Sequence, residues 1–236
     1  MSDAQLTFEL PLRAALGRSD FFQAESNADA LAAVEGWRDW AHGCLLLTGP
    51  SGAGKTHLAH VFGAACPGAA IIAAADLHGA DIPALAARPG IAVEDADRIA
   101  GDITAETALF HLYNLTHAER GHLLVTAAAP PRDWGLTLPD LKSRMQATPM
   151  ARLDAPCDAL LAAVLVKLFA DRQIAVQPAL IGWLLARIER SFAAAGAVVA
   201  RLDAAALARR QPVTRSLAAA VIGLSLDSGD AKGDDD

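Results

Sequence analysis

The sequence predicts an α/β fold, in which a parallel sheet with helices on both faces is followed by a small all-helical lid domain. Three observations lead to this prediction. Short apolar runs alternate with helix-like segments over residues 44–153, the glycine-rich stretch GPSGAGKT follows the first run, and only helical periodicity remains after Pro156. Strands that alternate with helices form parallel sheets, because each crossover helix packs back against one face.

Four short apolar runs are expected to be buried strands, since Gly, Asp or Pro lies close to the ends of each. They span residues 44–49, 70–76, 91–95 and 122–127, and a fifth strand is expected at 150–153. The helix-like segments between them span 55–65, 82–87 and 104–120. The order of these elements predicts a sheet that is covered on both faces.

The pattern changes after Pro156, where apolar residues recur at helical spacing. Pro178 opens a second helical segment, because the first turn of a helix accepts proline. A third helix is expected at 194–209, and a short apolar piece follows it. These features divide residues 19–236 into three parts. They are an α/β nucleotide-binding domain at 19–155, the helical lid at 156–226 and a disordered acidic tail at 227–236.

The composition excludes several classes of protein. Hydrophobic residues make up 53% of the 236 residues, but no apolar run reaches the roughly 18 residues that a membrane span needs. The N-terminus lacks the basic and apolar regions of a signal peptide, so a cytoplasmic protein without membrane contact is expected. The net charge of −7 disfavours a broad basic face for duplex DNA.

The cysteines and histidines show no convincing ligand spacing for a metal. Cys44, Cys66 and Cys157 lie far apart without a C-x-x-C pair, so three reduced and mostly buried thiols are expected. His57 and His60 follow the glycine-rich stretch and are expected to be packing or surface residues.

The strongest functional signal is GPSGAGKT, which follows an expected strand and opens an expected helix. Its glycines let backbone N–H groups turn toward phosphate oxygens, and the helix N-terminus adds a positive end. Lys55 is expected to reach the β- and γ-phosphates, and the Thr56 hydroxyl to bind Mg²⁺. The stretch predicts a site for ADP or ATP formed by Gly49, Pro50, Ser51, Gly52, Ala53, Gly54, Lys55 and Thr56.

An acidic pair at the end of the 91–95 strand completes the expected phosphate site. Glu94 is expected to help hold Mg²⁺, and Asp95 to orient the attacking water. The order Glu then Asp differs from the usual Asp then Asp or Glu, and Mg²⁺ is exacting about geometry, so slow hydrolysis is expected. The alternative is a pair of solvated loop carboxylates.

Near the N-terminus, the stretch QLTFEL alternates apolar residues with other residues. Alternation with a period of two is typical of a half-buried strand, and Pro11 is tolerated at a strand edge. The same spacing also suits a short peptide that is offered to a partner. The residues of this stretch alone leave both interpretations open.

The stretch GPSGAGKTHLAHVF resembles the replication-initiator branch of the AAA+ ATPases, which is the DnaA family. RSDFFQAESNADALAA is similar to the segment that this family places over the adenine, and GDITAETALFHLYN, HLLVTAAAPPRDW and LPDLKSRM follow in the family's order. The resemblance spans about residues 19–224. It implies an AAA+ fold and adds Phe21, Phe22 and Asn27 to the nucleotide site. Two positions depart from the family pattern: Thr126 is the one polar candidate left to sense the γ-phosphate, and an ungapped match puts Ala193 at the family's lid arginine, with Arg190 as the candidate three residues earlier on the same helical face.

The chain ends where DnaA would continue into its helix-turn-helix domain. Together with QLTFEL, this ending resembles the Hda-type homologues of DnaA, whose N-terminal peptide docks on the DNA polymerase sliding clamp. The resemblance implies that residues 1–18 are a clamp-binding peptide and linker. Its contacts with the clamp would be Gln5, Leu6, Phe8 and Leu10, and the chain would meet DNA only indirectly through the clamp.

The stretch LPDLKSRM places Arg144 where this family has its arginine finger. The resemblance implies a regulator that stimulates ATP hydrolysis by DnaA and so prevents re-initiation of chromosome replication. A guanidinium supplied in trans stabilises the charge that develops on the γ-phosphate. Arg144 and Asp95 are therefore the expected catalytic residues, and weak hydrolysis by the chain alone is expected. Homo-oligomerisation stays open.

Three other functions fit parts of the sequence. A self-sufficient AAA+ ATPase of the helicase-loader type would need a basic channel for single-stranded DNA, and the sequence of this acidic chain gives no sign of one. A small-molecule P-loop kinase would need an acceptor site and fits the helical lid badly. A structural adaptor tethered to the clamp would use nucleotide only for folding, and its regulation would not depend on Arg144.

Overall fold

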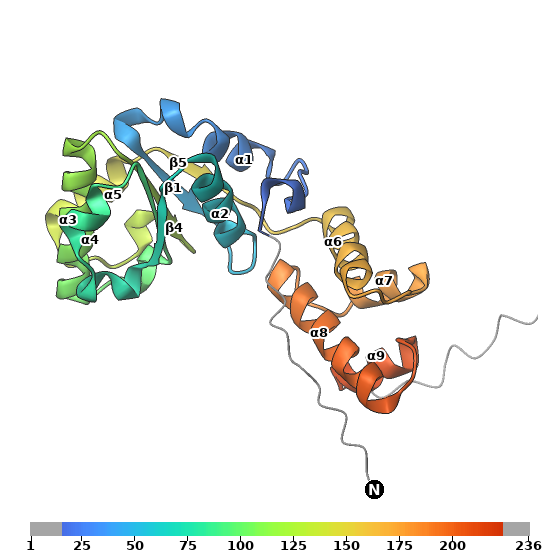
Figure 1. Ribbon diagram of the computed structural model, residues 1–236. Helices are drawn as coiled ribbons and strands as arrows, with labels where there is room; N and C mark the ends of the chain where they lie inside the picture. The colour runs from blue at the N-terminus through green and yellow to red at the C-terminus, as the bar shows by residue number, and fades with distance from the viewer. Residues whose placement is uncertain (1–15, 224–236) are drawn as a thin grey trace, which may run out of the picture.

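The computed structural model describes residues 16–223, which form a five-stranded sheet with helices on both sides and a separate group of four helices (Figure 1). The strands lie in the order β2-β3-β4-β1-β5, and every neighbouring pair is parallel. Their bounds are β1 Cys44–Thr48, β2 Ala70–Ala73, β3 Gly90–Glu94, β4 His122–Ala127 and β5 Met150–Arg152. The predicted α/β class is confirmed.

Helices cover both faces of the sheet because successive side chains of the central strands point to opposite sides. Leu46 of β1 faces a core built with the helices α3, α4 and α5, whereas Leu45 and Leu47 face a core built with α1 and α2. All three leucines are buried. The helices span α1 Ala28–Glu35, α2 Lys55–Ala65, α3 Ile82–Ala86, α4 Ile103–Ala118 and α5 Pro139–Ala147.

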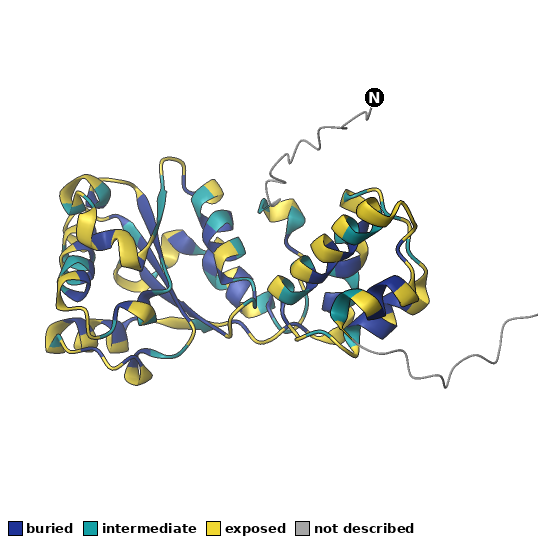
Figure 2. Ribbon diagram, turned by 90° about the horizontal axis from the view of Figure 1, so that it is seen from below, coloured by how far each residue is buried: buried dark blue, intermediate teal, exposed yellow. Residues whose placement is uncertain are grey.

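The lid has a hydrophobic core of its own, which Figure 2 shows as buried segments on the inner sides of its helices. Phe169 and Leu184 belong to this core and are almost completely buried. The side chains of Ser191 and Thr214 accept hydrogen bonds from backbone N–H groups and so cap the last two helices. The four helices span α6 Asp158–Asp171, α7 Pro178–Leu185, α8 Phe192–Arg209 and α9 Arg215–Ile222.

One local expectation was wrong. The strand expected to reach Asp76 ends at Ala73, because the chain turns into a 3-10 helix over 74–79 that buries Ala74 and Leu77 in the core. The thiols are mostly buried, as expected, since Cys44 and Cys66 are buried and Cys157, just before α6, is exposed. Burial raises the pKa of the Cys44 thiol to about 12.

Several expectations fall on residues that the structure does not describe. The predicted clamp contacts lie within 1–15, and the predicted acidic tail lies within 224–236. Within residues 16–223, no helix combines the length and the apolar character that crossing a membrane requires.

Candidate nucleotide-binding site

The glycine-rich loop between β1 and α2 forms one end of the site, which we call the phosphate end because the sequence predicts that phosphate binds there. The left-handed backbone at Gly54, with φ 106°, ends this loop and starts α2 at Lys55. A Cβ at Gly49 would lie 2.5 Å from the carbonyl oxygen of Leu153, so only glycine fits there. The loop therefore packs against the chain that follows β5 while its backbone leads into the N-terminus of α2.

The Lys55 side chain is buried and folds back over the loop. Its Nζ donates to the carbonyl oxygens of Gly49, at 2.7 Å, and Pro50, at 3.0 Å. Burial lowers the pKa of the Lys55 amine, while the nearby carboxylates of Asp95 and Asp97 act in the opposite direction. A phosphate oxygen carries a full negative charge and is a stronger acceptor than these carbonyls, so the ammonium is suited to bind phosphate.

The acidic pair lies at the carboxyl end of β3. Glu94 is the last residue of the strand, and its Oε1 is buried without a hydrogen-bond partner in the described part of the chain. Asp95 adopts a left-handed backbone with φ 56°, and its carboxylate lies 3.4 Å from the Arg98 guanidinium. The Thr126 hydroxyl accepts a hydrogen bond from the Asp95 N–H at 3.1 Å, which fixes this turn.

The lid contacts the phosphate loop directly. The N–H of Phe192 donates to the carbonyl oxygen of Gly52 at 2.8 Å, and a Cβ at Gly52 would lie only 2.7 Å from Ser191 Cβ. The first turn of α8 therefore rests on the loop that would hold the phosphates.

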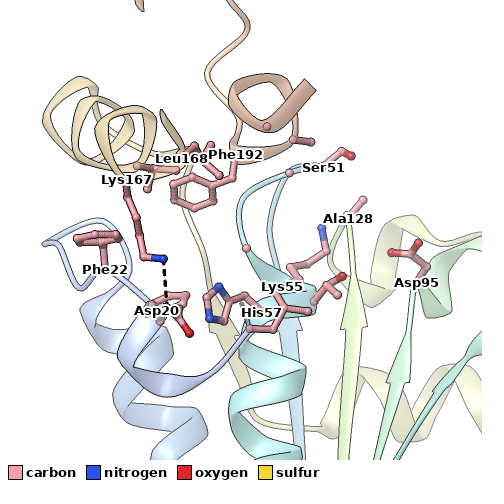
Figure 3. Close-up of a pocket in the computed structure, with 18 of the residues that line it drawn as sticks. Asp20, Phe22, Ser51, Lys55, His57, Asp95, Ala128, Lys167, Leu168 and Phe192 are labelled. Atoms are coloured by element: carbon pink, nitrogen blue, oxygen red, sulfur yellow. Dashed lines mark ion pairs between the residues drawn. The ribbon is translucent and has the colours of Figure 1, made fainter. Parts of the chain in front are cut away.

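A pocket of about 540 Å³ lies between the sheet domain and the lid. The end of this pocket formed by Asp20, His57, Lys167 and Phe192 is called the base end here. In it, Lys167 of α6 pairs with Asp20 at 3.2 Å and with Asp171 at 2.9 Å. Figure 3 shows Lys167 and Phe192 reaching down from the lid toward His57, with Lys55 and Asp95 at the other end. The pocket therefore extends from the glycine-rich loop to the helices of the lid.

The comparisons with known proteins agree on the fold. No family model matches the chain. The chromosomal replication initiator protein DnaA of Cutibacterium acnes is 25% identical over 225 residues, which cover 88% of this chain and 44% of that protein. This chain therefore spans less than half the length of that relative.

Solved structures are similar over most of the chain. Domain III of DnaA from Thermotoga maritima covers 90% of this chain and 98% of its own, with a TM-score of 0.77 and 15% identity. The AMPPCP-bound DnaA of Aquifex aeolicus covers 72% of this chain and 60% of its own, with a TM-score of 0.62 and 15% identity. The fold is that of a DnaA-like AAA+ domain.

Within this AAA+ fold, many of the predicted nucleotide contacts come together. The pocket lining includes Phe21, Phe22, Ser51, Gly52, Gly54, Lys55, Thr56 and Asp95. Gly49, Pro50 and Ala53 belong to the same loop but lie outside the lining. Their roles toward a nucleotide stay predictions.

Three predicted contacts lie elsewhere. Asn27 is buried and holds the loop before α1, because its Oδ1 accepts from the Ala24 N–H and its Nδ2 donates to the Phe22 carbonyl. Thr126 is buried behind Asp95. Arg190 is exposed and pairs with Asp158 at 3.1 Å, outside the pocket lining. Asn27 and Thr126 can shape the site without touching a ligand.

Arg144 lies on α5, outside the lining of this chain's own pocket. Its side chain is exposed, and its guanidinium carbon lies 6.0 Å from the centre of the Tyr113 ring on α4. The Thr148 hydroxyl donates to the Arg144 carbonyl oxygen and closes the end of the helix. The charge is therefore available to a partner.

The sequence analysis missed several residues of the base end. His57 was expected to pack or face solvent, but it lines the pocket and its Nε2 lies 2.9 Å from the Gly17 carbonyl oxygen. Burial lowers the pKa of its imidazole. The sequence does contain a signal for Lys167, because it is the one charged residue between Asp158 and Asp171 on α6. No sequence pattern singles out Phe192.

Residues 16–223 contain no cluster of three or more His, Cys, Asp and Glu side chains that could hold a metal by themselves. A Mg²⁺ site that relies on nucleotide phosphates needs fewer protein ligands. Thr56 lines the pocket, whereas Glu94 lies outside its lining and has the unpartnered buried oxygen described above. The Thr56 hydroxyl fits a cation held jointly with phosphate, and the direct role predicted for Glu94 stays a prediction.

Proposed function

We propose that this chain is a nucleotide-binding regulator that docks on the DNA polymerase sliding clamp and stimulates ATP hydrolysis by DnaA, preventing re-initiation of chromosome replication. The observation that supports it best is the exposed Arg144 on a DnaA-like AAA+ domain, outside that domain's own pocket. An arginine in this place can serve a nucleotide that a second protein holds.

The chain's own pocket is proposed to bind ADP or ATP. The N–H groups of the β1–α2 loop and the N-terminus of α2 would receive the phosphates, and the Lys55 ammonium would exchange its carbonyl partners for phosphate oxygens. Thr56 and Glu94 would hold Mg²⁺, which neutralises phosphate charge when bound. The relatives with bound AMPPCP support this proposal.

Hydrolysis in this pocket is proposed to be slow. Asp95 is the residue that could orient an attacking water, but its carboxylate faces Arg98 across 3.4 Å and is about half exposed. Thr126 uses its hydroxyl oxygen as an acceptor for the Asp95 N–H. With this arrangement the pocket would hold a bound nucleotide for a long time instead of hydrolysing ATP rapidly.

Arg144 is proposed to act in trans. Its guanidinium would approach the γ-phosphate of ATP held by DnaA and stabilise the charge that develops during transfer to water, an effect worth roughly 10³ to 10⁵ in rate for such residues. A planar guanidinium suits this role because it can donate two parallel hydrogen bonds to phosphate oxygens.

Docking on the clamp is proposed to use Gln5, Leu6, Phe8 and Leu10, which lie outside the described residues. The alternation of apolar side chains in QLTFEL supports a short peptide that buries a few anchors in a partner's pocket. In this proposal the protein works in the cytoplasm and meets DNA only through the clamp.

The test measures ATP hydrolysis by DnaA in the presence of clamp and DNA. We expect the wild-type chain to raise the rate, and Arg144→Ala to lower the stimulated rate by at least about 100-fold. Lys142→Ala is the matched control, since Lys142 is exposed on the same helix. The double variant with Gln5→Ala and Leu6→Ala should lose the part of the stimulation that depends on adding the clamp. Any stimulation that the wild-type chain gives without the clamp should remain.

Two outcomes would contradict the proposal. Full stimulation by the Arg144→Ala chain would leave a structural adaptor as the better account. Brisk ATP turnover by the chain alone, increased by single-stranded DNA, would favour a self-sufficient AAA+ ATPase of the helicase-loader type.

A further inference from the structure

Glu106 is a charged side chain in the interior of the sheet domain. It lies in the first turn of α4 and is fully buried, with 0% of its surface exposed. Its contacts within the described chain include no ion pair. A buried carboxylate without a counter-ion is costly unless its oxygens accept several hydrogen bonds.

Both oxygens of Glu106 accept such bonds. Oε2 accepts from the Leu138 N–H at 2.7 Å, the Thr137 N–H at 3.0 Å and the Thr137 hydroxyl at 3.0 Å. Oε1 accepts from the Gly101 N–H at 2.8 Å. Burial raises the pKa of this carboxyl, but the hydrogen bonds outweigh burial and hold the pKa below its usual value.

These bonds join two segments that are distant in sequence. Gly101 ends the loop that begins at Asp95, the acidic residue in the pocket. Leu138 is the N-cap residue of α5, which carries Arg144. The side chain of the N-cap residue Leu138 makes no capping hydrogen bond with α5. The Glu106 carboxylate of α4 supplies an acceptor at this helix start, because it accepts from the Leu138 N–H.

The same helix also holds the other end of α5. Tyr113 lies two turns after Glu106 on α4, and its ring lies beside the Arg144 guanidinium. Leu109, between them, shares a core cluster with the buried Leu141 and Met145 of α5. One face of α4 therefore contacts α5 near its start, along its length and near Arg144.

We propose that Glu106 is a positioning residue for Arg144. It fixes the start of α5 against α4 and against the loop that follows the acidic pair, so that the guanidinium is presented at a defined place on the surface. This inference rests on the proposed function of Arg144 and adds the group that sets its geometry.

The test compares Glu106→Gln with the wild-type chain in two measurements. Glutamine keeps the shape but turns one acceptor oxygen into an N–H donor, and in either orientation of the amide this donor faces a backbone N–H, that of Gly101 on one side or those of Thr137 and Leu138 on the other. We expect hydrogen exchange at one or more of the amides of Gly101, Thr137 and Leu138 to become about tenfold faster. We also expect the stimulated ATPase rate of DnaA to fall about fivefold or more, because a displaced guanidinium loses alignment.

Three controls separate positioning from general damage. Glu119→Gln changes an exposed acid at the other end of α4 and should alter neither measurement. ADP affinity of the Glu106→Gln chain should stay within about twofold of wild type, because none of the hydrogen-bond partners of Glu106, namely Gly101, Thr137 and Leu138, lines the pocket. In the Arg144→Ala background, Glu106→Gln should cause no further loss of stimulation.

The outcomes distinguish this inference from the proposed function. If Arg144→Ala leaves stimulation intact, the proposed function fails, and the exchange rates still decide whether Glu106 fixes α5. If Arg144→Ala abolishes stimulation while Glu106→Gln does not lower it, the positioning role is wrong. If Glu106→Gln does not fold, Thr137→Val decides, since it removes one donor from an exposed residue and should speed exchange at Leu138 about twofold.

Discussion

The two ends of the pocket are built in different ways. The phosphate end comes from one continuous stretch, which leads from β1 through the glycine loop into α2, together with the end of β3. The base end joins the segment around Asp20, His57 of α2, and the lid helices α6 and α8. A contiguous stretch can be recognised in the sequence, whereas a site assembled from distant segments depends on how they pack.

The two ends also differ in their chemistry. The phosphate end offers backbone N–H groups and the buried ammonium of Lys55. The base end offers aromatic surface from Phe22 and Phe192, and an ion pair between Lys167 and Asp20 whose side chains are about a quarter exposed. We therefore expect substitutions at the phosphate end to weaken nucleotide binding more than substitutions at the base end.

The largest effect is expected for Lys55→Met, which removes the ammonium but keeps much of the apolar stem. A buried charge that contacts phosphate is worth enough that ADP affinity should fall on the order of 100-fold. Isothermal titration with ADP measures the change, and Lys142→Met is the control, since Lys142 is exposed on α5 and lies outside the pocket lining. If Lys55→Met lowers ADP affinity less than Phe192→Ala or Lys167→Met does, the base end contributes more to binding than the phosphate end, contrary to our expectation.

A smaller effect is expected for Phe192→Ala. The ring lines the base end, and a base that stacks on an aromatic side chain gains about 1–3 kcal/mol, so ADP affinity should fall about tenfold. Because the Phe192 N–H bond to Gly52 involves only the backbone, the lid should keep its contact with the loop. Fluorescent ADP displacement gives the affinity, and an unchanged value would place the base elsewhere.

Lys167→Met should weaken ADP binding only about two- to fivefold, because partly exposed ion pairs contribute little. The substitution breaks the pairs with Asp20 and Asp171 and so loosens α6 from the segment that precedes α1. The difference from wild type should shrink as salt increases, since salt screens charges that solvent reaches. A loss that does not depend on salt would indicate direct contact with the nucleotide instead.

The smallest effect is expected for Arg190→Ala. Its guanidinium pairs with Asp158 away from the pocket lining, so ADP affinity should change by less than about twofold. Asp158→Ala breaks the same pair and is the matched control. A tenfold loss confined to Arg190→Ala would show that the arginine reaches the nucleotide and takes the role of the lid arginine.

Much of the sheet domain could be predicted because its signals are local. The apolar runs that became β1, β3 and β4 are short, buried and bounded by turn residues. The end of β2 could not be predicted in the same way. Ala74 and Leu77 follow β2, and the 3-10 helix at 74–79 buries both of them in the core. Whether this segment continues as a strand therefore depends on packing with distant residues.

The sequence by itself determined the parallel sheet, the lid and the phosphate loop, because periodicity and a glycine pattern are properties of neighbouring residues. Only the tertiary structure decided that Lys167 and His57 line the pocket, that Arg190 pairs with Asp158, and that Glu106 joins α4 to α5. These contacts connect residues far apart in the chain. Their partners are therefore set by packing, which no local pattern records.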